Sequence, residues 1–326
     1  AYRCIWQDKV FAVSIHVGLT PAVVSALSGQ DMLIRSDAAC LEARHLGDGG
    51  VCESRSPKQE EENRRPSLLS GEQLGQALAA GQLRIEAAPI HDLRANAPAV
   101  KLCLLSMRLP SMQASQSYQM LIDAAERQGV AQAYDHHLLA AAIELLARSQ
   151  SSPTQLCWLV PVSASVLETA ATYEFVRGRL VAQGVRGQGL CFLFDEALAS
   201  AHTSRLMAFA QQVRALGCQI ALGRFGAGST SFALLHTLAP SYIQISPSLT
   251  RSLPGTNSLT ALLRAILDIT AEHGVPAIAG DVADVPTLET LAEQGIAYAY
   301  GPVIAPREPH LAWFEGVVMR GQVVPD

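Results

Sequence analysis

The sequence predicts an α/β fold in the form of a (β/α)8 barrel, and two observations carry that prediction. Between residues 70 and 310, short β-type runs alternate with amphipathic stretches of helical period, which is typical of a parallel sheet covered by helices. The runs are eight in number, as a closed barrel requires. An open doubly wound sheet is the competing architecture, but no G-x-G-x-x-G follows the first run.

Local signals place the individual elements of this barrel. The first helix is expected to begin at Ser70, because Ser70 and Gln73 have the spacing of a capping box, and Gly81 stands where a C-terminal cap would fall. The expected strands are Leu83–Pro89, Lys101–Met107, Leu156–Val162, Leu190–Asp195, Gln219–Leu222, Tyr242–Ile245, Ala277–Ala279 and Ala297–Tyr300. The further expected helices are Ser117–Gln128, Asp135–Arg148, Ser165–Gln183, Ser204–Leu216, Leu259–His273 and Val285–Gln294.

The residues before the barrel carry signals of their own. Two β-rich runs around the polar Asp8-Lys9 pair predict a hairpin, and a helix follows, which is too little chain for an independent core. The charged stretch Glu53–Pro66 indicates a solvated linker. The hairpin strands are expected at Tyr2–Gln7 and Val10–Val17, and the helix at Met32–His45. The expected organisation is a segment 1–52, a linker 53–69, a barrel domain 70–310 and a C-terminal tail 311–326.

Composition excludes several classes of protein. The chain has 326 residues, of which 49% are hydrophobic and 16% charged, so it buries a core rather than remaining disordered. Its apolar runs fall short of the roughly 20 residues of a membrane helix, so no membrane insertion is expected. A net charge of -5 provides no basic surface for nucleic acid. Seven cysteines without a C-x-x-C pair predict reduced thiols and a cytoplasmic location.

Seven short motifs follow one another along the barrel region. The longest is ALGRFGAGSTS at Ala221–Ser231, and the others lie at Ala88–Ile90, Val160–Ala164, Phe194–Glu196, Ile243–Ser246, Ala279–Ala283 and Tyr300–Pro302. The longest resembles the DDFGTGYSS segment of EAL domains, the cyclic di-GMP phosphodiesterase family. The others resemble, in chain order, that family's QPI, VNLSA, EITE, LKID, AEGVE and QGY segments. This resemblance runs from about Ser70 to Pro306 and implies an EAL-type, TIM-like barrel.

The first 52 residues carry a second resemblance. Tyr2–Gly18 is similar to the strand pair that follows the signature loop of a GGDEF domain, and Arg35–Arg44 is similar to the last helix of that domain. The resemblance implies that residues 1–52 are the C-terminal remnant of a degenerate GGDEF domain. The signature loop would lie upstream of Ala1, so no cyclase activity is expected from this chain.

The EAL resemblance also implies where a catalytic site would stand. Two-metal phosphodiesterases bind Mg²⁺ or Mn²⁺ through carboxylates at the carboxyl ends of barrel strands. Here every such position carries a different residue, and Arg224 adds a positive charge where metals would bind. We therefore expect no metal, no cofactor and no phosphodiesterase activity, and a site filled by side chains. The replaced positions are Leu104, Pro161, Leu193, Gly223, Arg224, Gln244, Gly280 and Tyr300.

Ligand binding without catalysis is a separate hypothesis. The chain is similar to the divergent, FimX-like branch of the family, whose members act as receptors of cyclic di-GMP. That similarity makes Ser106, Arg108 and Arg224 the candidate ligand-binding residues, with Arg224 as a bidentate phosphate donor. The alternative for Arg224 is an ion pair with Asp195, Glu196 or Asp281.

The resemblance leaves three functions open. The first is an inactive interaction or receptor module in bacterial cyclic di-GMP signalling, in pilus or surface-motility control, with a homodimer through the EAL domain. The second is a cyclic di-GMP effector that recruits a PilZ-type adaptor protein. The third is residual hydrolysis that uses Asp195, Glu196 and Asp281.

Overall fold

The chain divides into two units, residues 1–68 and 69–326, which are described separately. The computed structural model describes residues 2–6, 9–13, 17–19, 36, 51–53, 71–94, 100–109, 118–150, 155–226, 231–250, 253, 257–310 and 314. In the first unit, β1 (Tyr2–Trp6) and β2 (Lys9–Val13) pair antiparallel, in agreement with the predicted hairpin. β3 (Val17–Leu19) and β4 (Val51–Glu53) form a parallel pair. The predicted helix Met32–His45 lies outside the described residues, Ser36 excepted, as does most of the linker and of the tail.

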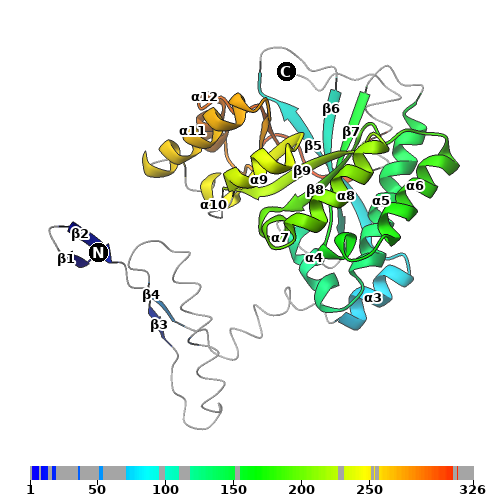
Figure 1. The fold of residues 1–326 in the computed structure, drawn as a ribbon, viewed down its shortest axis with the longest axis horizontal. Coiled ribbons are helices and arrows are strands. Elements are labelled where there is room, and N and C mark those ends of the chain that lie inside the picture. Colours follow the sequence, from blue (N-terminus) through cyan, green and yellow to red (C-terminus); the bar gives the residue numbers. More distant parts are fainter. Residues whose placement is uncertain are drawn as a thin grey trace, which may run out of the picture. The chain divides into compact units, whose positions relative to one another are not determined.

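The second unit is a closed barrel of eight strands, and each predicted strand is present. Figure 1 labels five of these strands, β5–β9, together with the surrounding helices. Neighbouring strands pair in sequence order, and β12 closes the ring by pairing with β5. A ninth strand, β13 (Glu308–Pro309), pairs with residues 86–87 of β5 on the side away from β6. The barrel strands are β5 (Arg84–Asp92), β6 (Val100–Arg108), β7 (Gln155–Pro161), β8 (Leu190–Asp195), β9 (Gln219–Phe225), β10 (Tyr242–Ile245), β11 (Ala277–Ala279) and β12 (Tyr298–Ala299).

The expectation of an entirely parallel sheet is wrong for β5. This strand runs antiparallel to both of its neighbours, β6 and β12, whereas the other barrel strands are parallel to one another. The physical reason is the connection: only residues 93–99 separate β5 from β6, and a parallel pair needs a crossover of a dozen residues or more. β5 therefore begins at the end of the barrel where the other strands finish.

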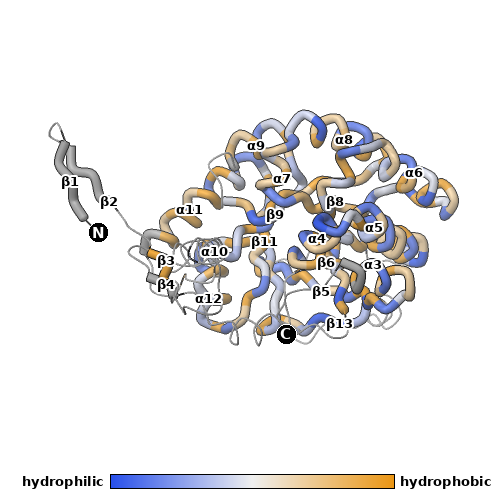
Figure 2. The backbone as a smooth tube through the Cα atoms, turned by 90° about the horizontal axis from the view of Figure 1, so that it is seen from below, coloured by the Kyte–Doolittle hydropathy of each residue, from blue (hydrophilic) through white to orange (hydrophobic). Residues whose placement is uncertain are grey.

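Helices cover the outside of the barrel, with hydrophilic and hydrophobic residues interleaved along them (Figure 2). The predicted helix Ser165–Gln183 is divided into a 3-10 turn, η1, and α6. Of the other predicted helices, α5 begins four residues earlier and α11 two residues earlier than expected, and the remaining boundaries agree to within one residue. The short helices α7, α9 and α10 were not predicted. The helices are α3 (Gly71–Ala79), α4 (Tyr118–Arg127), α5 (Ala131–Arg148), η1 (Ala164–Leu167), α6 (Ala171–Gln183), α7 (Glu196–Ala201), α8 (Thr203–Ala215), α9 (Ser231–Leu238), α10 (Pro247–Thr250), α11 (Asn257–Glu272) and α12 (Val285–Glu293).

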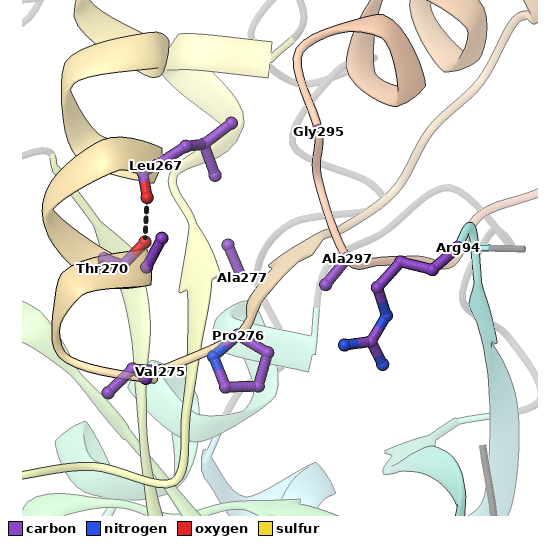
Figure 3. A pocket seen from close by; sticks show the side chains of 10 residues that line it. Arg94, Leu267, Thr270, Val275, Pro276, Ala277, Gly295 and Ala297 are labelled. Atoms are coloured by element: carbon purple, nitrogen blue, oxygen red, sulfur yellow. Dashed lines mark hydrogen bonds between the residues drawn. The ribbon is translucent and has the colours of Figure 1, made fainter. Parts of the chain in front are cut away.

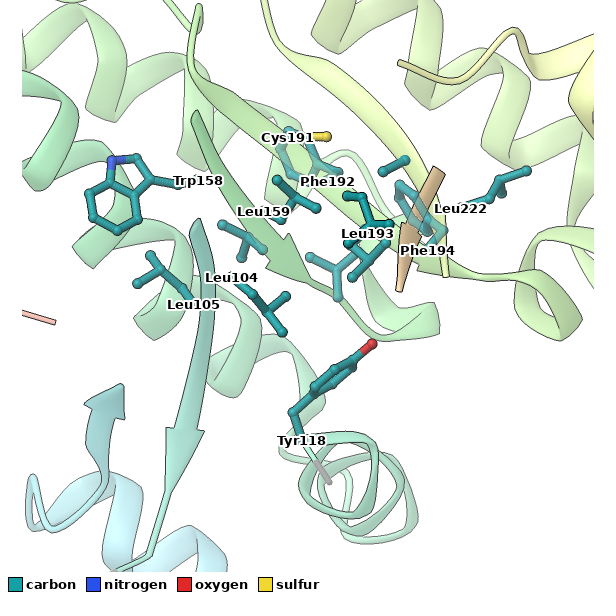
Figure 4. Close-up of a cluster of buried hydrophobic side chains, with 14 of the residues drawn as sticks. Leu104, Leu105, Tyr118, Trp158, Leu159, Cys191, Phe192, Leu193, Phe194 and Leu222 are labelled. Atoms are coloured by element: carbon teal, nitrogen blue, oxygen red, sulfur yellow. The ribbon is translucent and has the colours of Figure 1, made fainter. Parts of the chain in front are cut away.

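Most of the strands are buried on both faces, because the barrel interior and the helix layer both exclude water; β5 is the exception, since buried and partly exposed residues mix along it. Trp158, Phe192 and Leu222 are fully buried, and Figure 4 shows how such side chains fill the space between the strands and the surrounding elements. This explains why the strands are continuous apolar runs rather than alternating ones. Among the described residues, no helix is both long enough and apolar enough to cross a membrane.

Candidate functional site

The barrel mouth, defined as the carboxyl ends of β6–β12 with the amino end of β5, gathers the residues that the sequence singled out. β6 carries Leu104, Ser106 and Arg108 toward this end, and the remaining strands contribute one or two positions each. Active sites of (β/α)8 barrels lie at this end. The other positions are Pro161 on β7, Leu193 on β8, Gly223 and Arg224 on β9, Gln244 on β10, Gly280 directly after β11 and Tyr300 directly after β12.

Three buried polar side chains, Tyr118, Gln244 and Tyr300, form a hydrogen-bonded row across the mouth. The Tyr118 hydroxyl donates to Gln244 Oε1 over 3.0 Å, and Gln244 Nε2 donates to the Tyr300 hydroxyl. Tyr118 reaches the strands from the first turn of α4 (Figure 4). Burial raises the pKa of Tyr118 and of Tyr300, so both phenols stay neutral. The polar groups of these three side chains hydrogen-bond to one another. The motifs in the sequence indicated Gln244 and Tyr300 but not Tyr118.

Two glycines, Gly223 and Gly280, leave space for this hydrogen-bonded row of side chains. A Cβ atom at position 280 would lie 2.5 Å from the Tyr300 hydroxyl oxygen and 2.7 Å from Gln244 Nε2. A Cβ atom at position 223 would lie 3.4 Å from Gln244 Oε1 and 3.4 Å from Leu193 Cδ1. Positions 223 and 280, which the resemblance assigns to acidic residues, are thus filled here by neighbouring side chains.

Arg224 forms an ion pair with Asp195, which is one of the three partners that the sequence allowed. Its Nε donates to Asp195 Oδ2, and the second oxygen of Asp195 accepts from the backbone N–H of Ala197 over 2.9 Å, which caps α7. The hydrogen bond and charge of Asp195 raise the pKa of Arg224. Arg224 has a φ of 50°, a left-handed backbone that costs a residue with a side chain about 1 kcal/mol or more.

A second ion pair lies across the mouth and was missed by sequence reasoning. Arg307 Nη2 donates to Asp281 Oδ1 over 2.9 Å, and Nη1 donates to the Ser106 hydroxyl over 3.1 Å. The guanidinium also lies 5.8 Å from the centre of the Tyr300 ring. Asp281, like Arg224, has a left-handed backbone, with a φ of 55°. Arg307 follows the last motif of the chain, so no motif pointed to it.

Arg108 completes a set of three arginine–carboxylate pairs at this end of the barrel. Its Nε lies 3.5 Å from Glu86 Oε1 on the adjoining strand. The candidate ligand residues therefore have protein partners: Arg108 contacts Glu86, Ser106 accepts from Arg307, and Arg224 contacts Asp195.

The acidic residues near the mouth do not fit a two-metal centre. Asp195 and Asp281 are each bound by a guanidinium, and Glu196 is buried and accepts from the backbone N–H of Gly226 over 2.8 Å. Within the described ranges, no three His, Cys, Asp or Glu side chains are placed to hold a metal ion. Hard divalent cations such as Mg²⁺ take oxygen ligands and need one or two carboxylates that are free to bind them.

A buried carboxyl group supports the loop after β7. Asp135 accepts hydrogen bonds from the Ser163 hydroxyl at 2.5 Å, the Ser165 hydroxyl at 2.9 Å and the Ser163 N–H at 3.1 Å. Burial outweighs these bonds and raises the pKa of Asp135 to about 7. Three donors on one side chain fix the start of η1 beside the mouth.

A hollow of about 470 Å³ lies at the opposite end of the barrel, between the end of α11, the start of β11 and the segment before β12. Its charged lining residue, Arg94, already donates to both Asp92 oxygens and to the Tyr298 hydroxyl. Figure 3 shows the other labelled side chains, which are mainly apolar. The charged lining residue of this hollow is thus already bound to neighbouring side chains.

The fold and the mouth together define a TIM-like barrel whose first strand is reversed. Comparison with known families gives the assignment: the EAL domain matches residues 72–307, and the chain belongs to that family. The resemblance seen in the sequence is thereby confirmed for the EAL part, whereas the match covers no part of residues 1–52.

The relatives of this chain among known proteins have low sequence identity to it. The cyclic di-GMP phosphodiesterase PdeB of Shewanella oneidensis is 23% identical over 306 residues, covering 94% of this chain and 36% of PdeB. An uncharacterized protein of Mycobacterium tuberculosis is 23% identical over 297 residues, covering 90% of this chain and 47% of that protein. The chain therefore spans less than half the length of these relatives.

Solved structures confirm the EAL-type fold. The FimX EAL domain of Pseudomonas aeruginosa bound to c-di-GMP superposes with a TM-score of 0.65 at 23% identity, covering 73% of this chain and 96% of that domain. The PaMucR phosphodiesterase in complex with c-di-GMP gives 0.65 at 20% identity, covering 74% of this chain and 98% of PaMucR. The FimX EAL domain and the PaMucR phosphodiesterase are thus equally similar to this chain in fold.

Proposed function

We propose that this chain is a catalytically inactive EAL domain that acts as an interaction or receptor module in bacterial cyclic di-GMP signalling. The observation that carries the proposal is the pairing of Asp195 with Arg224 and of Asp281 with Arg307. A two-metal phosphodiesterase needs free carboxylates to hold its ions and activate water. The replaced strand-end positions supply none.

A hydrolysis assay tests this proposal directly. Purified protein is incubated with cyclic di-GMP and Mn²⁺ or Mg²⁺, beside an active EAL phosphodiesterase as positive control, and the linear product is measured. We expect no turnover above the protein-free blank. Enzyme-like turnover that Asp195→Asn or Asp281→Asn abolishes would instead establish the residual phosphodiesterase that uses Asp195, Glu196 and Asp281.

The second candidate is a FimX-like effector that recruits a PilZ-type adaptor in pilus or motility control. The similarity to FimX EAL domains solved with c-di-GMP favours it, as do the cationic side chains at the mouth. Its test is retention of a purified PilZ-domain protein on the immobilised chain with and without cyclic di-GMP. Retention that does not change with the nucleotide would reject this effector role.

We also propose a GGDEF remnant at residues 1–52 and a cytoplasmic location. The antiparallel β1–β2 pair supports the first, and the unpaired buried cysteines of the barrel support the second. NMR spectroscopy of the full chain, isotope-labelled only in residues 1–68, would test the remnant. It should show a helix at Met32–His45, and its absence would reject the assignment.

A further inference from the structure

The guanidinium groups of Arg224 and Arg307 lie on either side of the hydrogen-bonded row formed by the side chains of Tyr118, Gln244 and Tyr300. Burial is the main cause of the raised pKa of Tyr118, and the charges of Asp281 and Asp195, the partners of Arg307 and Arg224, add to it. Arg224 follows Gly223, where a Cβ atom would lie 3.4 Å from Gln244 Oε1, so one ion pair lies beside the middle of the three hydrogen-bonded side chains. Arg307 lies over the Tyr300 ring at one end of this row.

Both guanidiniums have unused donors. An arginine carries five N–H groups. Within the described residues, Arg224 uses only its Nε–H, and Arg307 uses one N–H on each of Nη1 and Nη2. The side chain of Arg224 is 46% exposed and that of Arg307 is 21% exposed, so solvent reaches both.

Their carboxylate partners hold these groups in place. Each guanidinium is fixed by a charge-assisted bond, and Asp195 is itself fixed by the cap of α7. A guanidinium whose orientation is set beforehand loses less entropy when it binds a phosphate oxygen. Two left-handed backbone positions, Arg224 and Asp281, belong to these pairs, and strain of this kind concentrates at functional sites.

We infer that Arg224 and Arg307 are the two cations of the barrel mouth that take the place of a metal pair: they neutralise Asp195 and Asp281 and bind a phosphodiester anion without any divalent metal. The inference rests on the proposed function and deepens it by assigning Arg307 as a ligand contact. A metal pair would supply positive charge to both the carboxylates and the phosphates. Here the two guanidiniums supply it, and they add directional N–H donors.

Calorimetric titration with cyclic di-GMP, once with EDTA and once with Mn²⁺, tests the inference. We expect the same affinity in both conditions, and a loss of about tenfold or more in each of Arg224→Met and Arg307→Met. Arg177→Met is the matched control, because Arg177 forms an ion pair of the same type with Glu174 on the outer helix α6. Its affinity should equal that of the unaltered chain.

A double variant separates the ligand contact from the charge balance. Arg307→Met leaves Asp281 uncompensated, whereas Asp281→Asn with Arg307→Met removes the pair together. If the guanidinium contacts the ligand, both variants bind weakly, and circular dichroism shows both folded. Recovery of full affinity in the double variant would overturn the assignment, since the loss would then come from the bare carboxylate.

The other outcomes are equally decisive. Binding that requires Mn²⁺, or no binding to the unaltered chain in either condition, overturns the inference and leaves the non-catalytic proposal intact. Hydrolysis of the nucleotide overturns the non-catalytic proposal instead. The two failures are therefore distinguishable in the same samples.

Discussion

Tyr118 and Gln244 are 126 positions apart in the chain, yet the hydroxyl of one donates to the side-chain oxygen of the other over 3.0 Å. Tyr118 opens α4 and Gln244 belongs to β10, so the bond spans the barrel mouth. Both residues are buried, and a buried amide oxygen that loses its donor carries the cost of its desolvation.

Tyr118→Phe should therefore destabilise the barrel by about 1–3 kcal/mol, because it leaves Gln244 Oε1 without that donor. Urea unfolding followed by circular dichroism measures the change. The matched control is Tyr173→Phe, whose hydroxyl forms no hydrogen bond among the described residues and whose loss should change the free energy of unfolding by less than about 0.5 kcal/mol. Equal effects of the two substitutions would contradict the bridging role.

Gly280→Ala should destabilise the protein by about 1–3 kcal/mol, since the added methyl group overpacks the contact between Tyr300 and Gln244. Gly178→Ala on α6 is the opposite case, because nothing lies within 4 Å of a Cβ there. Alanine in that helix should stabilise by roughly 0.5–1 kcal/mol. Thermal unfolding of the two variants gives the comparison, and a neutral Gly280→Ala would show that the mouth has free space.

Asp135 should make stability depend on pH. Its pKa is raised in the folded protein from 3.8 to about 7, so the folded state binds a proton more tightly than the unfolded state. The resulting stabilisation is complete below about pH 4 and is lost as pH rises to about 7. Asp135→Asn should flatten the free energy of unfolding between these limits, as measured by urea titrations at pH 5, 6 and 7.5. A slope identical to that of the unaltered chain would exclude Asp135 as its source.

The outer face of α9 and α11 should carry the homodimer contact. Phe232 and Leu262 are each 43% exposed, and His236 on α9 meets His273, just beyond the end of α11, edge to face. Leu262→Glu should convert a dimer to a monomer in light scattering, because a carboxylate is costly to bury at an interface. Val181→Glu is the control, since Val181 is 76% exposed on α6. A chain that is monomeric without substitution, or a dimer that Leu262→Glu leaves intact, would contradict this.

The positions of the barrel strands could be predicted from sequence, because each strand is a short apolar run bounded by polar residues. The reversal of β5 is a property of its connection to β6 rather than of its own residues, and the strand pattern alone does not contain it. β13 has two residues and one of them is proline, so no periodicity marks it. The helix Ser165–Gln183 was predicted as one piece because its apolar spacing continues through the break.

The site was predictable in part. Motif positions located Leu193, Gln244 and Tyr300 at one end of the barrel, since the ends of successive strands must meet there. The pairing of Arg224 with Asp195 rather than with Glu196 or Asp281 depends on distances that the sequence does not contain. Tyr118 and Arg307 belong to no motif, and only the three-dimensional path of α4 and of the segment before β13 brings them to the mouth.

The reversal of β5 also determines which residues lie beside its amino-terminal half. β5 starts beside Arg108, at the mouth, and β13 leaves beside Ala87, close to the same end. Arg307 directly precedes β13, so the short strand that pairs with the amino-terminal half of β5 starts at a residue whose guanidinium donates to Asp281 and Ser106. The position of that strand and the geometry of the ion pair are therefore coupled through a single peptide bond.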